Sequence, residues 1–205
     1  MPIRGSAAAD ELLAGIRDSL GDSARVTLAT CDAAADAIAG AALLLIEAFR
    51  GGYKLLAFGN GGSAADAQHL ASELAGRFDA ERPALPALAL TTNGSELTAI
   101  GNDYGFEHVF ARLVEAHGRV GDVAVAISTS GDSPNVIAGV AEARKRGLST
   151  IALTGKGGGA LAGAVDVAVV VPSEVTARVQ EAHGAVCHVL CELVEAAVFP
   201  ETVAT

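Results

Sequence analysis

Tryptophan is absent from this 205-residue chain, and aromatic residues make up 4% of it. Alanine and glycine are abundant instead, so the hydrophobic core has to be built from small side chains at close approach. Charged residues are also few, at 19%, whereas 51% of the residues are hydrophobic. This composition excludes a disordered chain and is typical of a folded globular protein. The length suffices for one α/β domain, or for one domain with a helical extension.

Basic residues are scarce, because 14 Lys and Arg stand against 24 Asp and Glu, for a net charge of −10. Broad nucleic-acid-binding or anionic-membrane-binding surfaces need clustered positive charge, so we expect neither nucleic acid nor membrane as a partner. A local phosphate site is still compatible with this charge, since backbone N–H groups and hydroxyls can hold an anion.

A secretory signal and long apolar runs are also missing from the sequence. The segment "MPIRGSAAADELL" at the start of the chain reaches two acidic residues before any apolar stretch of useful length. The most apolar helical run, 37–46, lies between Asp36 and Glu47 and is too short to span a bilayer. We therefore expect a cytoplasmic protein.

Cysteine is rare, and its three copies do not have the spacing of a disulfide framework. An odd number of cysteines in a chain without a secretory signal favours reduced thiols. The three residues are Cys31, Cys187 and Cys191.

Short apolar runs alternate with helical stretches along most of the chain. The apolar runs, which suit strands buried on both faces, are 53–58, 86–90, 122–127, 149–154 and 165–171. Helical spacing predicts helices at 7–20, about 24–50, 63–76, 105–117, 134–146 and about 176–198. Strands that alternate with helices predict a parallel sheet with right-handed crossovers. We expect one domain over 1–205, with an α/β core at 51–199 and a helical extension at 1–50.

Two loops that follow expected strands are rich in glycine or serine, and parallel sheets bind ligands beyond the carboxyl ends of their strands. The first loop is Gly59–Ser63, in which Ser63 and Asp66 resemble a capping box with Ser63 at the N-cap. The second is Ser128–Pro134, in which Ser133 precedes a proline suited to the first helical position.

Together, the two loops predict one phosphate site, formed by hydroxyls and by free N–H groups at helix N-termini. The alternative is ordinary turn and cap chemistry. Neither loop matches the nucleotide-binding patterns. A third glycine-rich loop, 154–160, is interpreted as a flexible connection.

His69 and Glu73 are four residues apart on the helix expected after the first loop, so they share one face. Such a pair can bind a divalent metal or transfer protons, and it can equally be a solvated surface interaction. His183, Cys187 and Cys191 share a face of the last helix, as the ligands of a metal site would. The Ala, Val and Leu residues around them favour packing in the core instead, where thiols are common.

Four segments resemble the phosphoheptose isomerases of the sugar isomerase (SIS) superfamily. They are "GNGGSAADAQHLASELAGRF", "TAIGNDYGFEHVFARLVEA", "GDVAVAISTSGDSPNV" and "VQEAHGAVCHVLCELVE". The resemblance covers about residues 25–199. It implies a flavodoxin-like three-layer α/β sandwich with a central parallel sheet (the SIS domain). It also implies N-terminal helices used in assembly, and a homotetramer with active sites near subunit interfaces.

The resemblance also implies a role for each residue that matches a family motif. Glu73 and His188 would be the catalytic acid/base pair. One Zn²⁺ per subunit would be bound by His69, Glu73, Gln180 and His188. Residues that would bind the phosphosugar substrate are Asn60, Gly61, Gly62, Ser63, Asn102, Asp103, Ser128, Thr129, Ser130, Ser133, Thr176 and Gln180. Gln180 and His188 are about 12 Å apart along a helix, so they would straddle the ion or come from different subunits.

The activity implied is the interconversion of sedoheptulose 7-phosphate and D-glycero-D-manno-heptose 7-phosphate through an enediol. This is the first step toward nucleotide-activated heptose. The alternative is a non-catalytic SIS-domain protein that binds the replication initiator or senses a phosphosugar. The presence of His69, Glu73 and His188 together favours the enzyme.

Overall fold

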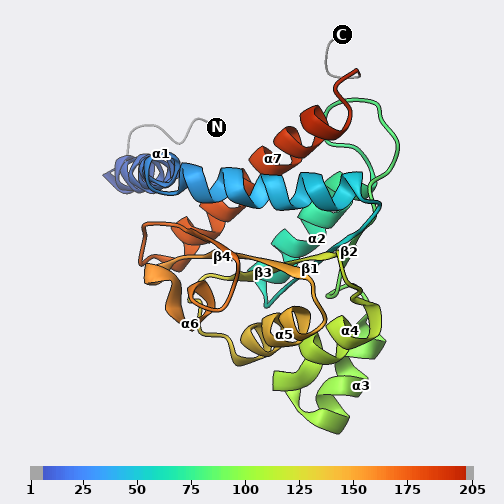
Figure 1. Ribbon diagram of the computed structural model, residues 1–205. Coiled ribbons are helices and arrows are strands. Elements are labelled where there is room, and N and C mark those ends of the chain that lie inside the picture. The colour runs from blue at the N-terminus through green and yellow to red at the C-terminus, as the bar shows by residue number, and fades with distance from the viewer. Residues whose placement is uncertain (1–6, 202–205) are drawn as a thin grey trace.

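The computed structural model describes residues 7–201, so residues 1–6 and 202–205 of the expected domain lie outside the described part. Within that part, five parallel strands form one sheet in the order β2-β1-β3-β4-β5 (Figure 1). The strands are β1 (Leu55–Gly59), β2 (Ala87–Ala89), β3 (Val123–Ser128), β4 (Ser149–Thr154) and β5 (Val167–Val170). This order is the flavodoxin-like one, and the α/β fold expected from the alternating pattern is confirmed.

Helices cover both faces of the sheet and make the fold a three-layer sandwich (Figure 1). One face is covered by α1 (Ala7–Arg50), α2 (Gly62–Ala75) and α7 (Thr176–Val198). The other face is covered by α3 (Gly94–Tyr104), α4 (Val109–His117), α5 (Pro134–Lys145) and α6 (Gly159–Ala162). Two 3-10 turns, η1 (Phe106–His108) and η2 (Lys156–Gly158), precede α4 and α6.

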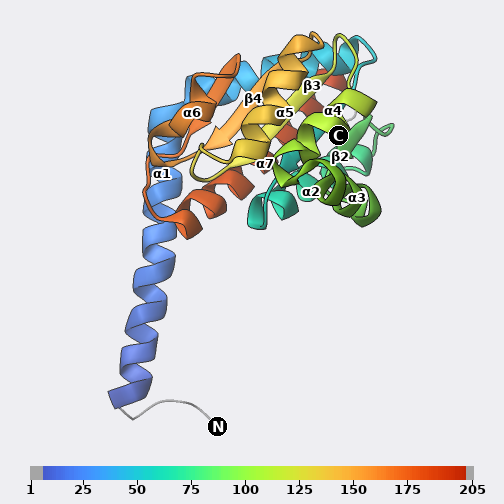
Figure 2. The same cartoon turned by 90° about the horizontal axis from the view of Figure 1, so that it is seen from below.

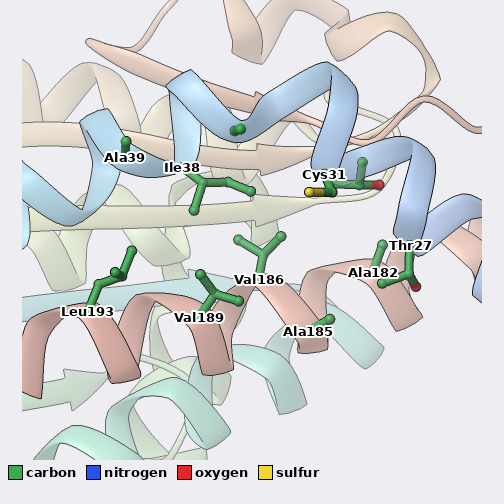
Figure 3. A pocket seen from close by; sticks show the side chains of 11 residues that line it. Thr27, Cys31, Ile38, Ala39, Ala182, Ala185, Val186, Val189 and Leu193 are labelled. Atoms are coloured by element: carbon green, nitrogen blue, oxygen red, sulfur yellow. The ribbon is translucent and has the colours of Figure 1, made fainter.

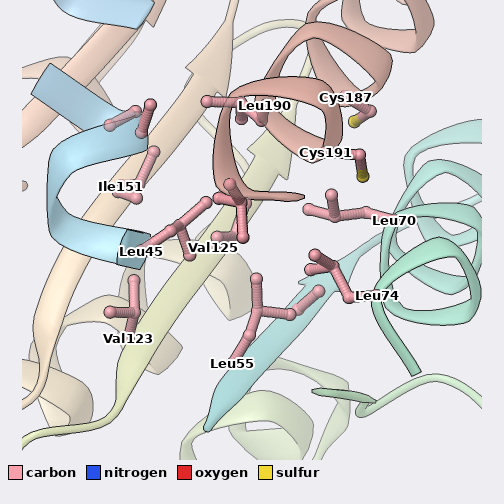
Figure 4. Close-up of a cluster of buried hydrophobic side chains, with 14 of the residues drawn as sticks. Leu45, Leu55, Leu70, Leu74, Val123, Val125, Ile151, Cys187, Leu190 and Cys191 are labelled. Carbon is pink, nitrogen blue, oxygen red and sulfur yellow. The ribbon is translucent and has the colours of Figure 1, made fainter. Parts of the chain in front are cut away.

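The core between the sheet and the first group of helices holds two of the cysteines. Figure 4 shows Cys187 and Cys191 of α7 facing leucines of α2 and strand residues. Burial raises the pKa of both thiols, and the three cysteines are free of disulfides in the described chain. The prediction that Cys187 and Cys191 belong to the core is therefore confirmed.

The prediction of two N-terminal helices, at 7–20 and 24–50, is wrong about the break between them, because α1 is a single helix of 44 residues. Gly21 keeps helical geometry within it. Local interactions also span the expected break, since Arg25 pairs with Asp22 and the Thr27 hydroxyl donates to the Ser23 carbonyl. A glycine without a following stop signal costs a helix about 1 kcal/mol, which α1 can tolerate.

By length and composition α1 could cross a membrane, although the run 37–46 considered alone appeared too short. Its C-terminal half, however, contributes Ala41, Leu45 and Phe49 to the core. We interpret α1 as a core helix whose N-terminal part projects beyond the domain (Figure 2).

Helix α3 was not expected from the apolar pattern, because it has no buried residue among those the structure describes. A capping signal does mark its start: the Asn93 side chain accepts hydrogen bonds from the N–H groups of Ser95 and Glu96. The helix expected at 105–117 begins later, as η1 and then α4, because Gly105 has a positive φ of 91°.

His183 of α7 is completely buried against the end of β4, where its Nε2 lies 3.2 Å from the carbonyl oxygen of Thr154. Within the described chain its Nδ1 is buried without a hydrogen-bond partner. Burial lowers the pKa of His183 from 6.5 to about 4, although the bond to Thr154 opposes the shift.

We predict that His183 makes the fold acid-labile. Because its folded-state pKa is depressed, the neutral form stabilises the fold fully above pH 6.5, and this stabilisation is lost as the pH falls toward 4. The loss amounts to at most about 3 kcal/mol. Urea unfolding between about pH 7 and about pH 4 measures it. His183→Gln should have a smaller pH dependence than the wild type, with His108→Gln as the exposed control. An equal pH dependence in His183→Gln would contradict the prediction.

Candidate functional site

The two loops expected to bind phosphate lie side by side, at the point where the order of the sheet reverses. Strands β1 and β3 are neighbours, with Gly59 opposite Ile127 at their carboxyl ends. The loops are joined by two reciprocal hydrogen bonds of 2.8 Å between the side-chain amides of Asn60 and Asn135. Because this switch point is where doubly wound sheets bind ligands, it is the first place to look for one.

In the first loop, α2 begins earlier than the capping box predicted. Gly61 is its N-cap, with φ 56° and ψ −120°, and buried Ser63 already lies within the helix. The prediction of Ser63 as the N-cap is therefore wrong. The positive φ of Gly61 turns the chain two residues before Ser63, and glycine adopts this conformation without strain. A Cβ on Gly59 would lie 2.7 Å from the Ile127 carbonyl, so glycine is also needed where the loop leaves the sheet.

In the second loop, three hydroxyls gather in one turn, as expected. Ser128 Oγ lies 3.4 Å from Ser130 Oγ and 3.1 Å from Ser133 Oγ. Ser133 is the N-cap of α5 and Pro134 opens the helix, which confirms that prediction. Thr129 belongs to the same turn and is half-buried.

The third glycine-rich loop packs against the second, a contact that the sequence did not predict. The N–H of Leu161 donates to the Gly131 carbonyl at 2.9 Å, and the N–H of Ala160 donates to Asp132 Oδ1 at 2.9 Å. A Cβ on Gly131 would collide with the backbone of Gly158. The turn that carries the serines is therefore held from both sides, by Asn60 and by this third loop.

His69, Glu73 and His188 form a polar cluster on α2 and α7. His69 Nε2 lies 3.0 Å from Glu73 Oε1 and 3.2 Å from His188 Nε2. The two imidazole rings meet edge to face, with their centroids 4.9 Å apart. The His188 ring also lies 5.5 Å from the ring of Phe78. The structure thus unites the helical pair predicted from the sequence with a histidine 119 residues away.

The donor atoms of this cluster suit a divalent metal ion. One atom from each of His69, Glu73 and His188 lies within 4.8 Å of the others. The Nε2 atoms of His69 and His188, 3.2 Å apart, can both offer lone pairs to a cation when the proton of each neutral ring is on Nδ1. Two histidines and one carboxylate form a donor set that zinc commonly takes, with a fourth position left open.

Gln180, the fourth predicted zinc ligand, lies nearer to the starts of α7 and α2 than the three residues of the cluster do. Its side-chain amide covers Gly62, where a Cβ would clash with it, and it interacts with the Asp66 carboxyl. Burial raises the pKa of Asp66 to about 6, against the opposing influence of Gln180 and His69. Asp66 Oδ2 is buried without a partner in the described part of the chain.

Asp66 and Phe78 are two residues at this site that the sequence reasoning missed. Asp66 was considered as a helix cap, although its position three residues before His69 places it on the same face. Phe78 follows the helix in an irregular segment, where apolar periodicity carries no signal.

Asn102, Asp103 and Thr176 stand apart from the cluster. Asn102 and Asp103 are exposed near the end of α3 and hydrogen-bond each other at 2.8 Å, on the face of the sheet opposite α7. Thr176 is exposed and begins α7, one turn before Gln180.

Comparisons with known proteins find relatives in both sequence and structure. The family model described as the SIS domain matches residues 21–155. The phosphoheptose isomerase of Roseiflexus sp. (strain RS-1) is 51% identical over 94% of this chain and 98% of its own. That of Rhodospirillum rubrum is 57% identical over 78% of this chain and 86% of its own.

A solved structure extends the likeness to three dimensions. The phosphoheptose isomerase of Neisseria gonorrhoeae superposes with a TM-score of 0.85 and 44% identity, covering 90% of this chain and 99% of that one. The SIS-domain match over residues 21–155 includes both serine loops and the helices that follow them. The chain therefore belongs to the phosphoheptose isomerase family of SIS-domain proteins.

Proposed function

We propose that this protein interconverts sedoheptulose 7-phosphate and D-glycero-D-manno-heptose 7-phosphate, the first step toward nucleotide-activated heptose. The observation that carries the proposal is the meeting of His69 and Glu73, on the helix that begins at the first loop, with His188 of α7. A protein that merely sensed a phosphosugar would need the loops without this cluster. Membership in the phosphoheptose isomerase family supports the same function.

The loops would hold the phosphate of the substrate. The binding groups are the hydroxyls of Ser63, Ser128, Thr129, Ser130 and Ser133, with the backbone of Asn60, Gly61 and Gly62. The N-termini of α2 and α5 add positive potential there through their helix dipoles. Ser63 and His69 are six residues apart, or about 9 Å of helix rise. That span suits an extended seven-carbon sugar phosphate whose carbonyl end reaches the cluster.

Glu73 and His188 would then move the protons. In the ketose, the Glu73 carboxylate removes a proton from C1, and the electron pair left behind forms the double bond of the enediol. His188 transfers the hydroxyl proton from the oxygen on C1 to the oxygen on C2. Return of the proton from Glu73 to C2 completes the aldose. General acid–base groups of this kind contribute about 10²–10⁴-fold each.

Zinc fits the donor set of the cluster, so we propose that His69, Glu73 and His188 hold one Zn²⁺ per subunit, with Gln180 as the fourth ligand. When bound, the ion would supply Lewis-acid stabilisation of negative charge on the sugar oxygens. Gln180 also lies where the substrate would pass from the phosphate loops to the cluster, beside Gly62.

The proposed base is tested by Glu73→Gln, which keeps the size of the side chain and removes its basicity. We expect the fold to be retained and turnover to fall about 10²–10⁴-fold. Incubating sedoheptulose 7-phosphate in D₂O and following deuterium at C1 and C2 by NMR measures it. Glu81→Gln, at a side chain that is 92% exposed, is the control. Wild-type rates of exchange in Glu73→Gln would remove this residue from the mechanism.

The proposed metal site is tested by His69→Ala. Loss of a ligand should weaken Zn²⁺ binding at least as much as loss of an outer-shell partner, which costs about 10–100-fold. Competition with a chromophoric chelator measures the affinity, and His108→Ala serves as a control at another exposed histidine. Equal affinities in the two variants would rule out the cluster as the zinc site.

We also propose that the protein is a homotetramer assembled through α1 and α7. An apolar groove between these helices is lined by Cys31, Ile38, Val186, Val189 and Leu193, among others (Figure 3). The projecting part of α1 exposes further large apolar side chains, namely Leu12, Ile16, Leu20 and Leu28. Apolar side chains gathered on exposed helices are typical of an interaction surface, and a second copy of the same helices would cover them.

Assembly would also account for the predicted residues that stand apart from the cluster. Asn102 and Asp103 of one subunit would line the pocket of another, so that each active site would lie near a subunit interface.

We further propose a cytoplasmic location, which is consistent with unpaired Cys187 and Cys191.

The tetramer is tested by Leu28→Asp, which places a charge on a side chain that is 70% exposed in the single chain. Light scattering of the wild type should give about four times the 20.5 kDa of one chain. The variant should give a smaller mass with its helical content intact. Val120→Asp, at a valine that is 73% exposed near the start of β3, should leave the mass unchanged. A wild-type mass of one chain would contradict the proposal.

A further inference from the structure

The segment between α2 and β2 folds back onto α7 through a buried ion pair. The Arg82 side chain is 0% exposed and that of Glu195 is 3% exposed, and Arg82 Nε donates to Glu195 Oε2 at 3.1 Å. Glu195 also accepts hydrogen bonds from the backbone N–H groups of Phe78, at 3.2 Å, of Asp79, at 3.3 Å, and of Ala80. Neither residue was singled out by the sequence, because the two are 113 residues apart.

The other end of Arg82 holds the end of α2. Its guanidinium donates to the carbonyl of Glu73 at 2.9 Å, to that of Leu74 at 2.9 Å and to that of Gly76 at 3.3 Å. The last carbonyls of a helix lack intrahelical partners, and a cation there is also favoured by the helix dipole. Arg82 is thus bonded to the backbone of Glu73, the residue proposed as the base.

Glu195 in turn binds the segment that packs against His188. It receives the backbone N–H of Phe78, whose ring contacts the imidazole of His188. The His188 ring is therefore held between Phe78 and His69. Burial alone would raise the pKa of Glu195, but its bonds from Ala80, Arg82 and Phe78 hold the pKa below its usual value. The carboxylate that anchors this segment stays charged.

We propose that Arg82 and Glu195 are positioning residues that set the separation between the Glu73 carboxylate on α2 and the His188 imidazole on α7. This inference rests on the function proposed above, because part of its test measures kcat for the proposed reaction. The ion pair lies at the C-terminal end of the α2–α7 contact. Arg82 is bonded to the helix that carries Glu73, and Glu195 is bonded to the segment whose Phe78 contacts His188. A small change in this pair would move the base relative to the histidine.

The chain contains a matched control pair at the opposite end of the strands. Asp122 is 2% exposed, receives Lys54 Nζ at 2.5 Å, and accepts backbone N–H bonds from Lys54 and Arg119. Like Glu195, it is a buried carboxylate that joins a cation to backbone donors. Because it precedes β3, it lies away from the carboxyl ends of the strands, where the candidate site is.

The experiment compares Glu195→Gln with Asp122→Asn in the full-length protein. For each variant the thermal midpoint, kcat and KM for sedoheptulose 7-phosphate, and the affinity and visible spectrum of bound Co²⁺ are measured. Loss of the ion pair should destabilise both variants. Glu195→Gln should also lower kcat by about 10–100-fold with KM nearly unchanged, since a misplacement of 1 Å can cost 10²-fold. Its Co²⁺ affinity should fall about 10–100-fold, with an altered spectrum.

Two further variants keep the test decisive if Glu195→Gln folds poorly. Glu195→Asp keeps the charge on a shorter side chain, and Arg82→Lys keeps the charge but cannot reach all the carbonyls. Both should fold and show smaller changes in the same direction. Wild-type kcat and Co²⁺ spectra in both would overturn the proposal, and so would an equal loss of kcat in Asp122→Asn. If the wild type failed to isomerise the substrate, the proposed function would fall, whereas the Co²⁺ comparison would still test the positioning.

Discussion

The packing of α2 against α7 is the contact on which the candidate site depends. The two helices run in the same direction, with Gln180 beside Gly62, His188 beside His69 and Glu195 beside the segment that follows α2. Each helix alone supplies part of a chemical unit. Joined at this register, they place two imidazoles and a carboxylate within reach of one small molecule or one ion.

Helix α2 links the two halves of the site because its ends and its middle have different tasks. Its N-terminus begins at the switch point of the sheet, where the positive end of the helix dipole and nearby hydroxyls suit an anion. Its last carbonyls are bonded by Arg82, which satisfies them with a positive charge. Between these ends, His69 and Glu73 face α7. The length of the helix thereby sets the distance between the phosphate loops and the reactive cluster.

Much of this could be predicted from local pattern. The apolar runs located all five strands of the described chain, and turn chemistry located the serine loops. The i, i+4 spacing placed His69 and Glu73 on one face. The errors were also local: α1 continues through Gly21, α2 begins two residues earlier than it would with Ser63 as its N-cap, and α3 is too exposed to show apolar periodicity.

The sequence by itself determined the alternation of strand and helix, the acidic surface, the hydroxyl-rich turns and the histidine–glutamate pair, because these depend on residues within a turn or two of one another. Tertiary structure alone decided that His188 meets His69 and that Arg82 meets Glu195. These partners are 119 and 113 residues apart. Their meeting depends on how two helices pack across a common core, and the residues near either partner do not encode that packing.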